Sequence, residues 1–416
     1  MKENKTKPDI RFKGFTDDWE QRKLDEVAFY RNGKAHEGCI DDKGSYVVVN
    51  SKFVSTDGKI RKYSKDQIEP LFKNEIAFVL SDVPNGRAIS KTFLVDESNK
   101  YTLNQRVAGI TPFKETYPYF LHILMNRNKY YLLFDDGVKQ TNLTVSDVLK
   151  FETKYPSYKE QTKIGQYFSQ LDNLITLHQR ECNQLKELKK TMLKKMFPRD
   201  GSNIPEVRFA GFTDDWEQRK LSEVLISLQN NTLSRVNLMS ETGVAKNVHY
   251  GDVLIKFGDI LDVSKEKLPM ISDESILKKY KASFLQNGDV IVADTAEDSS
   301  VGKCSEIIGL NDEIVLSGLH TIPYRPVEKF ASGYLGYYLN SSAYHNQLIP
   351  LMQGIKVMSI SKSAMQNTYI IYPKLEEEQA KIGQYFSQLD NLITLHQREL
   401  EILKNLKKTC LKRMFI

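Results

Sequence analysis

The chain has 416 residues, which is enough for two or three domains that each bury a core of their own. Its net charge of +6 and its pI near 8.8 agree with a polyanionic partner such as DNA but do not establish one. No apolar run approaches the roughly 20 residues of a membrane helix, and residues 1–10 lack the apolar region of a signal peptide. We therefore expect a cytoplasmic protein without a membrane segment.

Two segments of the chain occur twice, almost without change. The first is FKGFTDDWEQRKL at 12–24, which returns as FAGFTDDWEQRKL at 209–221. The second is KIGQYFSQLDNLITLHQRE, which is identical at 163–181 and at 381–399. The stretches that lie between the copies have drifted far apart in sequence. The repeated segments form a common frame, and the stretches between them differ. Such a chain is suited to holding two different recognition domains in a fixed geometry.

The two variable stretches, about 28–158 and 225–376, are predicted to share one mixed fold. Short β-branched runs bounded by turn residues predict buried strands at 76–80, 253–257 and 290–293. Longer runs with helix-spaced leucine and tyrosine predict helices at 119–133 and 333–351. Each variable half is therefore expected to be α and β around a small sheet, with the drifted positions mainly in loops.

Faint similarities between the halves suggest equivalent positions and candidate DNA contacts. Gly137-Val138-Lys139 corresponds to Gly354-Ile355-Lys356 in regions that otherwise differ. A lysine shared by two halves that read different sequences is better suited to holding phosphate than to reading bases, although a solvated surface lysine is the alternative for each position. The candidate DNA contacts are basic and amide side chains: Asn85, Arg87, Lys91, Lys139, Gln140, Asn142, Lys246, Lys303, Lys356 and Lys362.

The repeated segments near 163 and 381 predict two long helices. Their apolar residues alternate at spacings of four and three, which is the pattern of a coiled-coil seam. The seam positions are Ile164, Phe168, Leu171, Ile175, His178, Cys182 and Leu185 in one copy, and Ile382, Phe386, Leu389, Ile393, His396, Leu400 and Leu403 in the other. Pro156 disfavours helix just before it, and Ser157 with Glu160 fits a capping box.

Further apolar residues flank each seam: Tyr167, Leu174, Leu177, Tyr385, Leu392 and Leu395. The matching stripes favour mutual packing of the two helices over packing of each helix on its own domain alone, and the flanks need another surface. His178 and His396 occupy the same seam position, which would allow a metal site. Histidines in a core or at its rim are far commoner, and the four cysteines, Cys39, Cys182, Cys304 and Cys410, lack metal-ligand spacing. We expect no metal.

The order of these parts predicts a domain organisation. We expect a first variable domain at 1–158, a helix at 159–197, a linker at 198–204, a second variable domain at 205–376 and a second helix at 377–416. The chain looks cut from a cyclic arrangement of two equivalent units. Its ends are therefore expected to lie close together, and one pseudo-twofold axis is expected to relate the halves.

The residues offer no catalytic machinery. The glycine-rich cofactor loop and the Asn-Pro-Pro-Tyr-like loop of a methyltransferase are absent from the sequence, and so is the GxxxxGK[ST] motif of a motor. Asp289, Asp294, Glu297 and Asp298 could suggest a metal-dependent nuclease, but the first half has no matching group, and a polar loop after a strand is the simpler interpretation. We expect no catalytic residues in this chain.

Two variable domains alternate with two long helices in this chain. Each helix is entered through a P-x-x-x-E-Q-like run, which is Pro156 to Gln161 in the first copy and Pro373 with Glu378 and Gln379 in the second. This pattern resembles the specificity subunit of a type I restriction–modification system. The resemblance covers essentially the whole chain. It implies an α+β fold in which two target-recognition domains each read half of a split double-stranded DNA sequence, and in which the helices form an antiparallel coiled coil that sets the gap. It also implies two methylating subunits docked around the helices, with S-adenosylmethionine bound there rather than in this chain, and a translocating restriction subunit.

Two other classes of function remain alternatives. One is a coiled-coil scaffold that binds protein without reading DNA, for which no salt-dependent DNA binding is expected. The other is an enzyme in its own right, a nuclease or methyltransferase with duplicated domains, against which the missing cofactor motifs argue. The bases that are read do not follow from the residues, because direct readout depends on a few side chains aimed at the groove edges.

Overall fold

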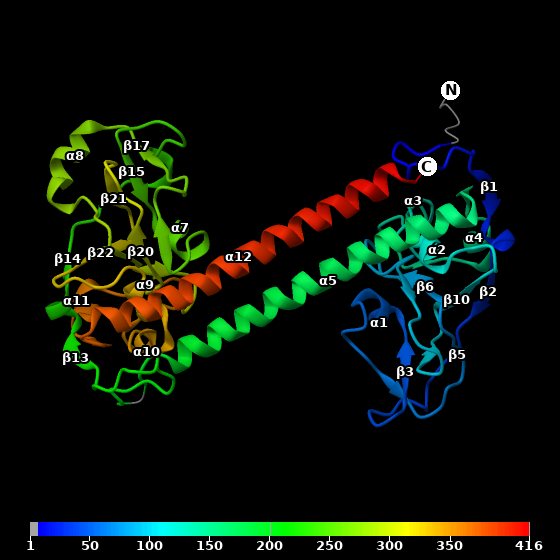
Figure 1. The fold of residues 1–416 in the computed structure, drawn as a ribbon, viewed down its shortest axis with the longest axis horizontal. Coiled ribbons are helices and arrows are strands. Elements are labelled where there is room, and N and C mark those ends of the chain that lie inside the picture. Colours follow the sequence, from blue (N-terminus) through cyan, green and yellow to red (C-terminus); the bar gives the residue numbers. More distant parts are fainter. Residues whose placement is uncertain (1–6, 200, 416) are drawn as a thin grey trace. The chain divides into compact units, whose positions relative to one another are not determined.

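The computed structural model describes residues 7–199 and 201–415, which form two compact units. The first unit contains the residues up to Gln179 together with those from Arg398 onward, and the second contains Arg180–Gln397. Each unit therefore holds one variable half, the beginning of one long helix and the end of the other (Figure 1).

The first unit is built on two small sheets. The antiparallel central sheet has the order β2 (Ala28–Asn32), β10 (Val107–Pro112), β6 (Ile76–Val79) and β8 (Thr92–Leu94). The second sheet has the order β4 (Tyr63–Ser64), β3 (Tyr46–Val49), β9 (Tyr101–Leu103) and β5 (Pro70–Leu71), with β3 and β9 parallel. Two short pairs join β1 (Glu20–Lys23) to β12 (Glu152–Tyr155) and β7 (Ser81–Asp82) to β11 (Thr141–Asn142). The helices are α1 (Ser51–Ser55), α2 (Pro118–Met125), α3 (Lys129–Leu132), α4 (Val145–Leu149) and the start of α5 (Tyr158–Lys195).

The second unit repeats this plan. Its central sheet has the order β14 (Leu225–Ser227), β22 (Thr321–Pro326), β18 (Val290–Ala293), β20 (Cys304–Ile308) and an added β16 (Ile260–Asp262). The smaller sheet has the order β17 (Met270–Ile271), β15 (Ala245–Val248) and β21 (Val315–Ser317), and the short pairs are β13 (Glu217–Lys220) with β24 (Tyr369–Tyr372) and β19 (Thr295–Ala296) with β23 (Met358–Ser359). The helices are α6 (Leu221–Val224), α7 (Tyr250–Ile255), α8 (Glu274–Tyr280), α9 (Tyr334–Asn340), α10 (Ser342–His345), α11 (Lys362–Gln366) and the start of α12 (Glu376–Arg413). Both variable halves thus have one mixed α+β fold.

The predicted strands at 76–80 and 290–293 are confirmed as β6 and β18, whose residues are all buried. The strand predicted at 253–257 is wrong, because this segment lies in and just after helix α7. The imidazole of His249 caps that helix by accepting the backbone N–H of Gly251 at 3.3 Å, and Val253 points into the core. A short apolar run has too few residues to distinguish the two periodicities.

The helices predicted at 119–133 and 333–351 are each broken into shorter pieces. In the first unit the break between α2 and α3 falls at Arg127, which has a positive φ of 54°, and at Asn128, whose side chain caps α3 by accepting the N–H of Tyr130 at 3.0 Å. In the second unit Ser341 separates α9 from α10, and a 3-10 turn follows at Ile349–Leu351. The hydroxyl of Ser341 donates to the carbonyl of Tyr338 at 2.6 Å. Side chains that hydrogen-bond to nearby backbone groups, as Asn128 and Ser341 do, offer the backbone an alternative to continued helix.

The two long helices, α5 and α12, are confirmed, and they run antiparallel within each unit. In the first unit Asp172 of α5 binds Lys407 at 2.5 Å, and His178, further along α5, lies 3.1 Å from Glu399, which comes earlier on α12. In the second unit Glu181 lies 3.3 Å from His396, and Lys189 binds Asp390 at 2.5 Å. In every pair the residue number rises on one helix as it falls on the other.

The seam residues divide between two roles. The first three seam residues of each copy are buried in the core of the globular part of their unit. They are Ile164, Phe168 and Leu171 in the first unit and Ile382, Phe386 and Leu389 in the second. Leu185 packs against the core of the second unit, and Leu403 packs against that of the first. Ile175, His178, Ile393 and His396 lie between these anchors. The stripe therefore serves both helix pairing and docking of the helix ends on the domains.

The arginine just before each repeated sequence block holds that block to the start of a long helix through a buried ion pair. The guanidinium of Arg11 donates two hydrogen bonds of 2.7 Å to the carboxylate of Glu160, which is only 1% exposed. Arg208 and Glu378 repeat this pair, and there the indole of Trp216 also donates to the carboxylate, at 3.3 Å. The expected capping box at Ser157 is only half formed: its hydroxyl accepts the N–H of Glu160 at 3.4 Å, while the glutamate carboxylate pairs with Arg11.

Replacing Arg11 with alanine should destabilise the first unit by about 3–5 kcal/mol, because Glu160 would stay buried without its counter-charge. Arg208→Ala is the matched control and should cost less, since Trp216 still donates to Glu378. Urea unfolding followed by hydrogen exchange in peptides containing β1 or β13 would report each unit separately. Equal losses in the two units would contradict this ranking.

The expected proximity of the chain ends is also found. The backbone N–H of Ile10 donates to the carbonyl of Arg413 at 3.0 Å, and Phe415 stacks on Phe120 with ring centroids 5.7 Å apart. The second unit has the equivalent bond from Val207 to Lys195, at 2.9 Å. Among residues 7–199 and 201–415, no helix combines the length and apolar character needed to cross a membrane.

Candidate nucleic-acid interface

Several loops gather at one end of the central sheet of the first unit. Strand β6 ends at Val79, and the antiparallel β10 begins opposite it at Val107, so the turn before β10 meets the loop after β6. The backbone N–H of Leu80 accordingly donates to the carbonyl of Arg106 at 3.0 Å. β11 pairs with β7, which brings the Gly137-Val138-Lys139 loop to the same end.

This end of the sheet brings together most of the candidates of the first half. Asn85 donates to the carbonyl of Gly137 at 3.2 Å, and Gln140 donates to Ser81 at 2.8 Å and to Asn142 at 3.3 Å. Arg87 and Lys139 are exposed in the same two loops.

Carboxylates shape both of these loops from within. Asp82 accepts the backbone N–H of Val83 at 2.9 Å and that of Ile89 at 3.0 Å. Asp136 accepts those of Val138 and Lys139 at 2.9 and 3.1 Å, and these bonds lower the pKa of its carboxyl group. The loop backbone is thus organised before any ligand arrives.

Lys91 has a different environment from the other candidates of the first half. Its ammonium donates to the carbonyl of Ser55, at the end of α1, at 3.0 Å and pairs with Asp57 at 2.8 Å. A DNA contact by Lys91 would therefore compete with these two bonds.

In the second unit, Lys356 and Lys362 lie near the equivalent end of the sheet, and both are exposed. Lys356 sits in a hairpin closed by reciprocal backbone bonds between Gln353 and Ser359, of 2.9 and 2.8 Å. Lys362 begins α11, and the N–H of Ile360 just before it donates to the carbonyl of Asp294 at 2.8 Å.

Lys246 and Lys303 are held by the protein itself. Lys303 donates to the carbonyls of Leu254 and Phe257 at 2.7 and 3.2 Å, and burial lowers the pKa of its ammonium. Lys246 donates to the carbonyl of Val263 at 2.9 Å and pairs with Glu313 at 2.7 Å. These two lysines do not join the group formed by Lys356 and Lys362.

The sheet end also presents polar residues that the sequence did not group together, several of which it did not single out at all. In the first unit a cavity of about 370 Å³ is lined by Asn50, Ser51, Lys52, Asn104, Gln105 and Arg106. In the second unit a cavity of about 390 Å³ lies at the corresponding end, and its lining includes Gln229, Asn230, Lys279, Asp294 and Lys362. In each unit these residues come from segments of the chain, both turns and short helices, that meet only in the folded structure, so spacing in the sequence could not have grouped them.

The acidic residues that could have indicated a nuclease do not form one carboxylate site. Asp289 forms two hydrogen bonds with Arg325, of 2.9 and 2.8 Å, although burial still raises the pKa of its carboxyl group. Asp294 accepts the hydroxyl of Thr295 at 2.8 Å, and Asp298 accepts the N–H of Ser300 at 2.9 Å. Asp289, Asp294 and Asp298 are thus each engaged by a separate partner, which supports the simpler interpretation of a polar loop after a strand.

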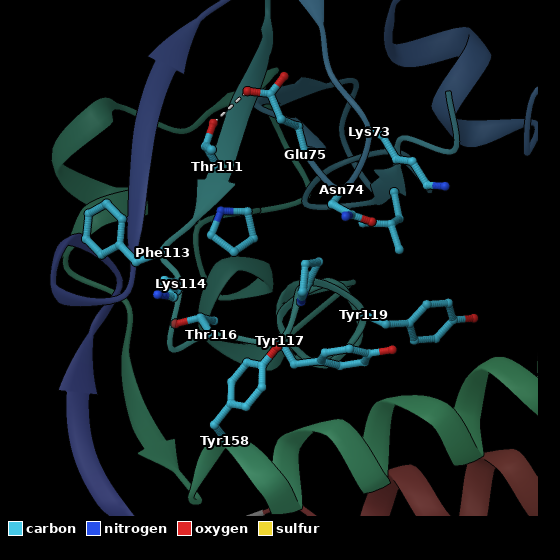
Figure 2. A pocket seen from close by; sticks show the side chains of 13 residues that line it. Lys73, Asn74, Glu75, Thr111, Phe113, Lys114, Thr116, Tyr117, Tyr119 and Tyr158 are labelled. Atoms are coloured by element: carbon cyan, nitrogen blue, oxygen red, sulfur yellow. Dashed lines mark hydrogen bonds between the residues drawn. The ribbon is translucent and has the colours of Figure 1, made fainter. Parts of the chain in front are cut away.

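A cavity of about 510 Å³ lies at the opposite end of the central sheet of the first unit. Figure 2 shows Lys73 and Asn74 on one side of it and Tyr117 and Tyr158 on another. Glu75, which leads into β6, accepts the hydroxyl of Thr111 there at 2.6 Å. This cavity and the gathered loops therefore lie at opposite ends of the central sheet.

Both halves of this chain match the model of a known protein family. The model of the type I restriction modification DNA specificity domain matches residues 16–187 and again residues 213–405. The chain therefore belongs to the family of proteins that carry this DNA specificity domain, and it holds two copies in tandem.

The curated relatives and solved structures agree with this assignment. The MjaVIII specificity subunit of a type I restriction enzyme from Methanocaldococcus jannaschii is 25% identical over 94% of this chain and 91% of its own length. The putative MjaX specificity subunit of the same organism is 23% identical over 94% and 91%. The S subunit of a type I restriction–modification system from M. genitalium has the same fold, with a TM-score of 0.62, 14% identity and 99% coverage of both chains. A chain from structural work on assembly and conformational transition of the type I R-M system has a TM-score of 0.51, 18% identity and coverage of 96% and 98%.

Proposed function

We propose that this chain is the DNA-reading specificity subunit of a type I restriction–modification complex. In this proposal, residues 1–158 and 205–376 are the two target-recognition domains, and each reads one half of a bipartite site in double-stranded DNA. The observation that carries the proposal is the recurrence of one sheet end in both units, with equivalent backbone turns but different polar side chains. Two readers of different sequences on one scaffold require this combination.

The long helices supply the surface for partner subunits in this proposal. Leu174 and Leu177 of the first unit are 42% and 48% exposed, and Leu392 and Leu395 of the second unit are 44% and 48% exposed. Paired, exposed leucines at equivalent positions suit two copies of one partner, which we assign to two methylating subunits. A restriction and translocation subunit would complete the assembly, which would act on DNA in the cytoplasm.

The chemistry of methylation belongs to the partner in this scheme. S-adenosylmethionine would bind the methylating subunit, and this chain would contribute recognition without catalytic residues of its own. Co-expression with the neighbouring methylating subunit, followed by sequencing of methylated bases in random DNA, tests the proposal. We expect adenine methylation at one bipartite motif with both proteins present and none with either protein alone. Turnover by the isolated chain with S-adenosylmethionine or magnesium would exclude the assignment.

Lys139→Ala should weaken binding to all DNA sequences alike. Lys139 and Lys356 share the Gly-x-Lys setting although the halves differ, so we assign both lysines to phosphate contacts. Loss of one phosphate contact should lower the slope of log affinity against log salt by about one. Titrations of the assembled complex over a range of salt concentrations would measure that slope, with Lys73→Ala, at the other end of the sheet, as the control. A changed sequence preference in the Lys139 variant would refute the phosphate role.

A further inference from the structure

The turn that leads into the second strand of each central sheet, β10 in the first unit and β22 in the second, has an unusual backbone in both units. Arg106 has a φ of +65° and His320 has a φ of +55°, in a region that non-glycine residues seldom adopt. Both residues use their carbonyl to accept the N–H that follows the neighbouring buried strand, from Leu80 at 3.0 Å and from Asp294 at 3.1 Å. The two positions are therefore structurally equivalent, although one holds a guanidinium group and the other an imidazole.

Arg106 is exposed in the turn before β10. Within the described residues, no hydrogen bond or ion pair engages its guanidinium group. The cavity that it lines together with Asn50, Ser51, Lys52 and Gln105 contains no carboxylate. An unpaired guanidinium group among hydroxyl and amide side chains forms a surface rich in hydrogen-bond donors. Such a surface matches the acceptor-rich edge of a nucleic-acid base pair.

His320 is held by its neighbours at one ring nitrogen. Its Nδ1 lies 3.4 Å from a carboxylate oxygen of Asp294 and 3.4 Å from the hydroxyl of Thr295. The ring also meets Tyr250 edge to face, with centroids 5.3 Å apart. The side chain is 48% exposed, and in the part of the chain that the structure describes, Nε2 has no hydrogen-bond partner. The imidazole is thus oriented through Nδ1 and available through Nε2.

We propose that Arg106 and His320 are specificity-determining residues, each of which contacts a base edge in the half-site of its own domain. This inference rests on the proposed function. Two domains that recognise different sequences need side chains that differ at equivalent backbone positions, as Arg106 and His320 do. The lysines that both domains share in their Gly-x-Lys loops are better suited to phosphate contacts, which do not depend on sequence. The planar guanidinium group of Arg106 fits the O6 and N7 acceptors of guanine, to which arginine donates two hydrogen bonds. His320 has a single free nitrogen and can form one hydrogen bond with a base, so its preference for one base should be weaker than that of Arg106.

The test uses the complex of this chain with its methylating subunit and sequencing of methylated random DNA. Arg106→Gly removes the side chain but keeps the backbone, because glycine adopts a positive φ readily. We expect discrimination at one guanine of the first half-site to fall about 5- to 150-fold, the range of one bidentate base contact. The second half-site should stay unchanged. Arg106→Lys should lose the preference for guanine as Arg106→Gly does, because lysine keeps the positive charge but lacks the bidentate geometry of the guanidinium group.

A matching substitution tests the second unit. His320→Gly should relax one position of the second half-site only, and His320→Arg should introduce a preference for guanine there. Lys73→Ala is the control of equal charge at the far end of the first domain, and it should leave both half-sites intact. A uniform loss of binding on all sequences, or an unchanged motif in both glycine variants, would overturn the inference. Failure of the unmodified complex to methylate any bipartite motif would refute the proposed function instead, so the two failures are distinct.

Discussion

Insertion of one heptad into each long helix should lengthen the gap between the two half-sites by about three base pairs. Seven residues add about 10 Å of helix, at about 1.5 Å per residue, and B-DNA rises about 3.4 Å per base pair. The insertions belong after Gln179 and Gln397, which are equivalent positions at the borders of the two compact units. Leu185 and Leu403 pack on the domain cores, so insertion beside them would disturb that docking.

Sequencing of methylated DNA would measure the new gap, and the half-sites themselves should not change. Insertions of three residues provide the control, because they turn the following apolar stripe by about 60° away from its partner, at 3.6 residues per turn. These variants should lose assembly with the methylating subunits. A well-folded heptad variant that methylates the original site would show that helix length does not determine the gap.

Replacing residues 225–376 with residues 28–158 of the same chain should give a target in which the first half-site occurs twice. The prediction follows from the shared frame: β14 and β2 begin the two variable segments at equivalent places, and the Arg208–Glu378 pair lies outside the exchanged region. The recognition loops travel with the exchanged segment, so their specificity should travel with them. The expected change is complete at the second half-site and absent at the first.

The reciprocal replacement, of residues 28–158 by residues 225–376, is the matched control. It should duplicate the second half-site and remove the first. Thermal unfolding of both chimaeras would establish that each one folds before its methylation motif is read. An exchange that altered both half-sites at once would contradict the modular arrangement.

The overall plan of this protein could be predicted from its amino-acid sequence. The two repeated blocks predicted a duplicated frame, and their apolar spacing predicted α5 and α12, because a long helix repeats its period often enough to be read without ambiguity. The buried strands β6 and β18 were also predicted, since both are short β-branched runs between turn residues. The residues and motifs of the frame likewise indicated the family that the comparisons then showed.

Features that depend on residues far apart in the chain became visible only in the folded protein. Residues 253–257 fall in and just after a short helix that the cap at His249 begins, and Glu160 pairs with Arg11, which lies 149 positions away. Arg106 becomes a candidate reader only because the turn before β10 folds beside the end of β6 and holds its backbone at a positive φ. Local periodicity reports which face of a segment is buried. It carries no information on which distant turn will lie beside that segment, and for this reason the grouping of side chains at the sheet end emerges only from the fold.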